Sequence, residues 1–174
     1  MARLLLLRHA KTEPAEAGER DRDRKLTARG RADAKAIGAY VVRHRLLPDL
    51  VLTSPAVRAE ETLTGVAAEF AKPPRVAREE RIYNASPDTL IRLIRETRDA
   101  KTLLLVGHHP GMHDVALALI ASGDTETRER LAEKLPTSGL VVIDFAFDDW
   151  SRLQVNSGRL ERFVSPRSIE TATD

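Results

Sequence analysis

The sequence LLLLRH at residues 4–9 places four consecutive leucines directly before an arginine and a histidine. A short, uninterrupted apolar run of this kind is typical of a strand that is buried on both faces of a parallel sheet. Such sheets bind their ligands in the crevice outside the carboxyl ends of the strands. Arg8 and His9 follow the run at that end, so the stretch predicts a buried strand and a polar site beside it.

Two further apolar runs repeat this arrangement. Residues 49–53 (DLVLT) lead into Ser54-Pro-Ala-Val-Arg58, and residues 101–106 (KTLLLV) lead into Gly107-His108-His109. If the three strands are parallel, their three polar clusters meet at one edge of the sheet. A single cluster of this kind is more often a salt-bridged surface feature or a structural histidine. Three clusters at three equivalent strand ends rarely arise by chance.

Segments with helical spacing alternate with these strands, each with a recognisable start or stop signal. They are the segment from its cap Thr27 to about Leu47, the segments capped by Ser54 and Ser86, and the segment after Gly111 that we expect Gly123 to close. Residues 18–25 carry charges of both signs and should form a solvated loop. Residues 140–147 and 152–156 are expected to pair as an antiparallel hairpin across Asp148-Asp149.

Strands that alternate with helices predict an α/β fold, a three-layer sandwich with a largely parallel central sheet and helices on both faces. The antiparallel hairpin would complete the sheet near the C-terminus. A length of 174 residues favours a single domain over residues 1–174. The tail from about Ser165 is expected to be loosely held.

The composition is that of an ordinary globular protein, with 42% hydrophobic and 31% charged residues and a net charge of +2. No cysteine is present, which excludes disulfides and thiolate sites. The apolar run at the start is too short for a signal peptide, and no run could span a membrane. We therefore expect a cytoplasmic protein that does not bind membranes. We also expect no nucleic-acid partner, because nucleic-acid binding would require basic residues gathered on one face.

The three polar clusters share one chemistry. We expect Arg58 to lie in the first turn of its helix, where backbone N–H groups and the helix dipole also favour an anion. Arg8 and Arg58, together with His9 and His108, form a cationic set without an acidic cluster among them. Such a set predicts a pocket for a dianion of the size of phosphate.

These residues resemble the three motifs of the histidine phosphatase superfamily, in the same order. Arg8-His9-Ala-Lys-Thr12 is similar to the family's Arg-His-Gly signature, Ser54-Pro-x-x-Arg58-Ala-x-x-Thr62 to its second motif, and Gly107-His108-x-Pro-Gly111 to its third. The alanine after His9, the short chain and the lack of a large inserted cap resemble the SixA-type phosphohistidine phosphatases. The resemblance covers roughly residues 3–165 and implies a phosphoglycerate mutase-like fold.

The resemblance also implies a mechanism. His9 would attack phosphorus and become a phosphohistidine that water hydrolyses, while Arg8, Arg58 and His108 position and neutralise the phosphoryl oxygens. No metal or cofactor would be required. The substrate would be a phosphorylated protein or a small phosphorylated molecule, and the residues expected to bind it are Lys11, Thr12, Ser54 and His109.

The general acid is the open part of this assignment. Family members that act on alkyl phosphates use a carboxylic acid to protonate the leaving oxygen. The aligned position here is Asn84, which is no acid, and Glu80 is the remaining candidate, although flanking arginines favour a solvated charge. A missing acid suits phosphohistidine, because an imidazole that is protonated on its distal nitrogen leaves as a neutral group.

Three alternatives remain. A metal-dependent hydrolase could use His108, His109, His113 and Asp114, but no zinc-hydrolase motif is present and Arg8 would repel a cation. A phosphatase of small phosphomonoesters would use the same site as the phosphohistidine phosphatase. A module that binds phosphate without turnover would share the fold. Kinases and nucleotide hydrolases are disfavoured because no glycine-rich phosphate loop occurs.

Overall fold

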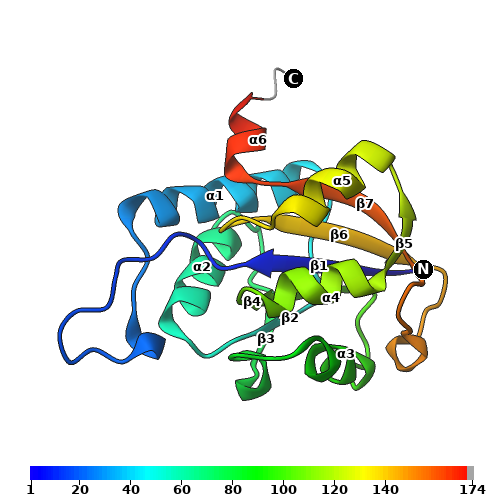
Figure 1. Ribbon diagram of the computed structural model, residues 1–174, viewed down its shortest axis with the longest axis horizontal. Helices are drawn as coiled ribbons and strands as arrows, with labels where there is room; N and C mark the ends of the chain where they lie inside the picture. The colour runs from blue at the N-terminus through cyan, green and yellow to red at the C-terminus, as the bar shows by residue number, and fades with distance from the viewer. Residues whose placement is uncertain (172–174) are drawn as a thin grey trace.

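A computed structural model of the protein describes residues 1–171 and is built on one seven-stranded sheet. The strand order is β3-β2-β4-β1-β6-β7-β5, and only β6 runs antiparallel to its neighbours (Figure 1). The strands are β1 (Ala2–Arg8), β2 (Leu50–Thr53), β3 (Arg75–Arg78), β4 (Thr102–Gly107), β5 (Ile120–Gly123), β6 (Leu140–Phe145) and β7 (Gly158–Val164). The predicted α/β class with a largely parallel sheet is therefore confirmed.

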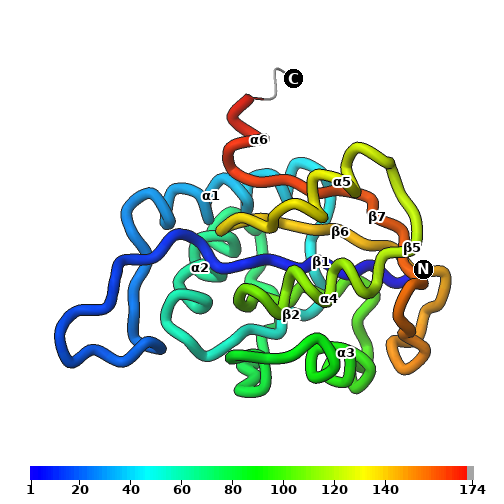
Figure 2. The backbone as a smooth tube through the Cα atoms, viewed as in Figure 1, coloured from blue at the N-terminus to red at the C-terminus, as the bar shows by residue number. Residues whose placement is uncertain are grey.

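Helices cover both faces of this sheet, as the course of the chain in Figure 2 shows. Helices α1 and α2 pack on one face, and α3 and α4 pack on the other. The helices are α1 (Ala28–Arg43), α2 (Val57–Ala67), α3 (Pro87–Arg95), α4 (Gly111–Leu119), α5 (Thr125–Glu133) and α6 (Pro166–Thr171), with 3₁₀ turns η1 (Asp21–Asp23), η2 (Glu80–Ile82) and η3 (Trp150–Arg152).

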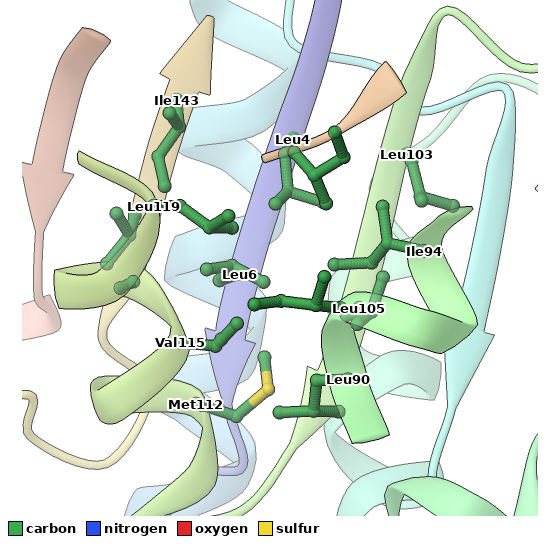
Figure 3. Packing of buried hydrophobic residues seen from close by; sticks show 14 of the residues in the cluster. Leu4, Leu6, Leu90, Ile94, Leu103, Leu105, Met112, Val115, Leu119 and Ile143 are labelled. Carbon is green, nitrogen blue, oxygen red and sulfur yellow. The ribbon is translucent and has the colours of Figure 1, made fainter. Parts of the chain in front are cut away.

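The leucine run of β1 supplies both hydrophobic cores. Leu4 and Leu6 point to the face covered by α3 and α4, where they pack with Leu105 and Met112 (Figure 3). The alternate residues Leu5 and Leu7 belong to the core beneath α1 and α2. All four leucines are fully buried. An apolar residue is therefore needed at every position, because the strand has no solvent-facing side.

Several predicted boundaries are confirmed and others are wrong. Thr27 caps α1 by accepting from the Gly30 amide at 2.9 Å, and Ser86 caps α3 in the same way. Helix α1 ends at Arg43 rather than Leu47, because His44 is its C-cap and the next residue adopts a positive φ. Ser54 is not a cap: α2 begins at Val57, and the Ser54 hydroxyl instead accepts from the Ala56 amide and contacts His108.

The C-terminal third differs most from the prediction. Helix α4 ends at Leu119, and residues 120–123 form β5 instead of a helix closed by Gly123. The hairpin partner of β6 is β7 rather than residues 152–156, because the chain first turns through η3, where the Trp150 indole donates to the Ala100 carbonyl at 2.7 Å.

The tail prediction is wrong for residues 166–171, which form α6, since Ile169 packs on the core and Glu170 pairs with Arg29. The last part of the predicted loose tail, residues 172–174, lies outside the described residues. None of the helices over residues 1–171 is both long enough and apolar enough to cross a membrane.

Candidate active site

Three adjacent parallel strands bring the predicted clusters to one edge of the sheet. Strand β4 lies between β1 and β2, and all three end at the same level in the ladder. The His9 amide donates to the Gly107 carbonyl at 3.0 Å, and the Ser54 amide donates to the Val106 carbonyl at 3.0 Å. The convergence expected from the sequence is therefore confirmed, and we call this edge the strand-end rim.

His9 lies at the bottom of the strand-end rim and is only 9% exposed. Its Nδ1 is 2.8 Å from the Ala10 carbonyl oxygen. A carbonyl only accepts, so Nδ1 carries the proton and Nε2 keeps its lone pair. Burial, with the nearby Arg58 and Arg8 charges adding to it, lowers the pKa of His9 to about 4. The ring is therefore neutral at neutral pH and has a nucleophilic nitrogen available.

The second motif holds the His9 loop in place. The Ala10 amide donates to the Thr62 hydroxyl at 2.9 Å, and that hydroxyl donates to the Arg58 carbonyl at 2.7 Å. Thr62 is fully buried. The peptide carbonyl that orients the His9 ring therefore belongs to a residue fixed by α2, the helix that also carries Arg58.

His108 lies beside His9, with 5.3 Å between the ring centroids. Its Nε2 is 2.7 Å from the Ser54 hydroxyl, and both residues are buried. Burial, and then the neighbouring His9 and Arg58, lower the pKa of His108 to about 3. In the unliganded protein His108 is therefore a neutral hydrogen-bonding group rather than a cation.

Two arginines supply the positive charge of the rim. Arg8 donates from Nη1 to the Leu135 carbonyl at 2.9 Å, and burial lowers the pKa of its guanidinium from the usual value. Arg58, 6% exposed, lies in the first turn of α2 as predicted. An arginine remains charged in proteins even when burial disfavours the charge.

Within residues 1–171, three buried side-chain atoms have no hydrogen-bond partner: Arg8 Nε, His108 Nδ1 and Ser138 Oγ. All three belong to this site, because the Ser138 amide donates to the carbonyls of both Arg8 and His9 at 3.1 Å. Buried polar atoms are normally paired, and exceptions call for an explanation such as a functional role. Three such atoms in one place leave hydrogen-bonding capacity at the rim that no described residue uses.

Two residues of the site were missed by the sequence reasoning. Asp21, from the loop expected to be merely solvated, accepts from Arg58 Nη2 at 2.9 Å, and its carbonyl accepts from Nη1 at 2.7 Å. Tyr83 donates to Asp21 Oδ2 at 2.6 Å, and its ring lies edge-on to His108 at 5.4 Å. These bonds, chiefly that from Tyr83, hold the pKa of Asp21 at about 2.

The remaining predicted residues lie farther out. Lys11 is exposed, while its carbonyl accepts from the Thr27 amide. The Thr12 hydroxyl accepts from Arg24 at 2.7 Å. His109 is exposed and stacks on His113 with 6.0 Å between centroids.

The surroundings of Glu80 do not favour the role of general acid in this conformation. Its side chain is 71% exposed, and both carboxylate oxygens accept from Arg22 at 3.0 and 3.1 Å.

The alternative of a metal-dependent hydrolase finds no support in the arrangement of the histidines. No group of three or more histidine, aspartate or glutamate side chains in the described part of the chain is arranged to hold a metal ion. His113 is engaged as well, since its Nε2 donates to the Leu131 carbonyl at 2.6 Å.

Comparisons with known proteins agree with this geometry. The family model of the histidine phosphatase superfamily (branch 1) matches residues 4–83. An uncharacterised protein of Mycobacterium leprae is 38% identical over 84% of this chain and 89% of its own length. A crystal structure from Agrobacterium tumefaciens, assigned as the phosphohistidine phosphatase SixA, is 33% identical with a TM-score of 0.81, covering 95% of this chain and 98% of that one.

A more distant structure shares the fold. The protein histidine phosphatase SixA in complex with tungstate is 20% identical, with a TM-score of 0.72 over 96% of this chain and 99% of that one. The match at one-third identity spans nearly all of both chains, and the family model covers the segment that holds Arg8, His9 and Arg58. The chain therefore belongs to the histidine phosphatase superfamily and is a phosphatase of the SixA type.

Proposed function

We propose that the protein removes phosphoryl groups from phosphohistidine on a partner protein, through a covalent intermediate on His9. The observation that carries this proposal is the neutral, buried His9 ring with its Nε2 lone pair free beside Arg8 and Arg58. Phosphoryl transfer needs a positioned nucleophile and fixed positive charge around the equatorial oxygens. This arrangement offers both.

The reaction has two steps. His9 Nε2 attacks phosphorus, and the bond from phosphorus to the leaving nitrogen breaks with its electron pair going to that nitrogen. Water then attacks the phosphorus atom on His9, the N–P bond breaks with its electron pair returning to Nε2, and inorganic phosphate leaves with both protons of the water. Arg8 and Arg58 would hold the phosphoryl oxygens in both steps, and His108 would donate or accept a hydrogen bond with Ser54 as its support.

The missing acid supports phosphohistidine over alkyl phosphates. Glu80 is engaged by Arg22, and Asp21, with a pKa of about 2, is ionised at neutral pH and has no proton to give. An alkoxide is a poor leaving group without a proton donor. A ring-protonated phosphohistidine leaves as neutral imidazole and needs no acid from the protein. Lys11 and His109, exposed at the outer part of the rim, are proposed to contact the protein that carries the phosphohistidine.

The test is hydrolysis of a phosphohistidine peptide and of p-nitrophenyl phosphate, each with EDTA present. We expect turnover by the wild type with both substrates, and loss of at least about 10³-fold in His9→Ala, since the nucleophile is removed. His44→Ala is the matched control, because this histidine lies at the C-terminal end of α1, where its ring packs against Tyr40 in a tilted arrangement. Turnover that survives in His9→Ala, or that EDTA abolishes, would contradict the proposal.

A further inference from the structure

Asp21 links the buried part of the strand-end rim to solvent. Arg58, whose side chain is 7% exposed, directs its two terminal nitrogens to the Asp21 carboxylate and carbonyl. The Asp21 side chain itself is 52% exposed. One carboxylate therefore touches a phosphate-binding arginine on one side and open solvent on the other.

The two carboxylate oxygens differ in how fully they are used. Oδ2 accepts short bonds from Tyr83 at 2.6 Å and from Arg58 at 2.9 Å. Among residues 1–171, Oδ1 accepts a hydrogen bond only from Arg24, at 3.3 Å. An ionised carboxylate offers about four lone-pair positions. Asp21 is thus held in place through Oδ2, and acceptor capacity remains at Oδ1.

The reaction geometry directs the leaving group toward this carboxylate. In an in-line displacement the leaving atom lies opposite the nucleophile. His9 is buried, whereas Asp21 is exposed and paired with Arg58, so a leaving group that remains attached to a partner protein must lie on the solvent side, where Asp21 is accessible. Tyr83, in contact with both His108 and Asp21, lines the same side of this path.

We propose that Asp21 is a specificity-determining residue that accepts a hydrogen bond from the distal N–H of the substrate's phosphohistidine ring. This inference rests on the proposed function. The bond from phosphorus to the near nitrogen breaks, its electron pair stays on that nitrogen, and the proton stays on the distal nitrogen, so neutral imidazole leaves. In the transition state the ring still carries part of its positive charge, which the Asp21 carboxylate stabilises.

The same carboxylate disfavours phosphate esters. A leaving phenolate or alkoxide gains negative charge in the transition state and has no N–H to donate. An ionised Asp21 repels that charge and offers it no proton. One fixed charge thus acts in opposite directions on the two substrate classes, and this difference separates its role from that of a residue that only orients Arg58.

The experiment compares kcat/KM of wild type, Asp21→Asn and Asp23→Asn with a phosphohistidine peptide and with p-nitrophenyl phosphate. Asparagine keeps an oxygen acceptor for Arg58 and Tyr83 but removes the charge. Asp23→Asn removes the same charge from the same turn, where the side chain pairs with Arg20 instead. We expect Asp21→Asn to lower kcat/KM for the peptide about tenfold, the effect of losing one charge-assisted hydrogen bond. For the ester, kcat/KM should stay unchanged or rise.

A pH profile adds a readout that a merely structural role would not move. Because the carboxylate favours the ring-protonated substrate in the complex, the alkaline limb of kcat for the peptide should shift to lower pH in Asp21→Asn. Asp23→Asn should leave kcat/KM for both substrates, and the alkaline limb of kcat for the peptide, unchanged. An equal loss with both substrates, or no loss with either, overturns the inference alone. A wild type that cleaves the ester but not the peptide overturns the proposed function and the inference with it.

Discussion

The Nδ1 atom of His9 lies 2.8 Å from the carbonyl oxygen of Ala10, the next residue in the chain. This bond fixes the tautomer of the ring, because a carbonyl oxygen accepts only from a protonated nitrogen. Thr62 holds the Ala10 amide on the other side of that residue. The first and second motifs therefore cooperate to keep Nε2 of His9 unprotonated.

We expect nitrogen-15 NMR of the unliganded protein to show His9 protonated on Nδ1 alone at pH 7. Its titration midpoint should lie near 4 rather than the usual 6.5, because burial and the two arginines disfavour a second proton. His9→Gln identifies the resonances by their disappearance. A midpoint at or above 6, or a proton on Nε2 at pH 7, would contradict the proposed role of His9 as the nucleophile.

The pH dependence of stability follows from the same two rings. In the folded protein His9 and His108 have pKa values of about 4 and about 3, so each ring takes up its second proton only below pH 5. In the unfolded chain the same rings take up that proton near pH 6.5. The unfolded state therefore takes up more protons as the pH falls through this window, and the free energy of unfolding decreases. The contribution of the two rings to the free energy of unfolding is fully present above the unfolded-state pKa of about 6.5.

Urea denaturation at pH 7 and pH 5 measures this effect. Each ring should contribute a loss of roughly 2 kcal/mol between the two values. Asp21, with its pKa of about 2, is ionised throughout and does not contribute in this window. His108→Asn should reduce the difference by about half. A free energy of unfolding that is the same at both pH values would show that the rings titrate normally.

Replacing Glu80 should have little effect on catalysis. Its carboxylate is exposed and engaged by Arg22, so Glu80→Gln is expected to change kcat/KM for p-nitrophenyl phosphate or an alkyl phosphate by less than about threefold. Glu79→Gln is the matched control, because the adjacent carboxylate is also paired with an arginine, Arg81. A general acid contributes about 10²–10⁴-fold, so a loss of that size with the alkyl phosphate would assign the acid to Glu80.

The sequence was most informative where burial imposes a pattern. Leu4 to Leu7 must be apolar at every position because the strand faces a core on both sides, and this pattern also revealed β2 and β4. Since parallel strands end at one edge, the predicted meeting of His9, Arg58 and His108 followed from topology alone.

The elements that the sequence did not reveal lack such a pattern. Strand β3 is exposed at all four residues, and α5 buries only Leu131, so neither has an apolar period to detect. The contact of Asp21 with Tyr83 joins residues 62 positions apart through polar atoms in two loops. Polar pairs of this kind depend on the final path of the loops, which residue spacing does not encode.

A substitution at Ser54 would distinguish a role in positioning His108 from a role in the stability of the protein. Its hydroxyl lies 2.7 Å from His108 Nε2 in a buried setting, and His108 Nδ1 has no partner among the described residues. Ser54→Ala would leave the ring without a hydrogen bond to hold it at the rim. We expect kcat for the phosphohistidine peptide to fall about tenfold, with a loss of about 1–2 kcal/mol in the free energy of unfolding.

Thr53→Val is the matched control for this prediction. The Thr53 hydroxyl, also buried, donates to the Ser54 carbonyl at 3.1 Å rather than to a histidine. Its loss should lower the free energy of unfolding by a similar amount while kcat stays within about twofold of the wild type. Parallel losses of kcat in the two variants would mean that Ser54 acts only through stability. A loss confined to Ser54→Ala, with a change in the His108 nitrogen-15 shifts, would establish that Ser54 orients His108 for the reaction.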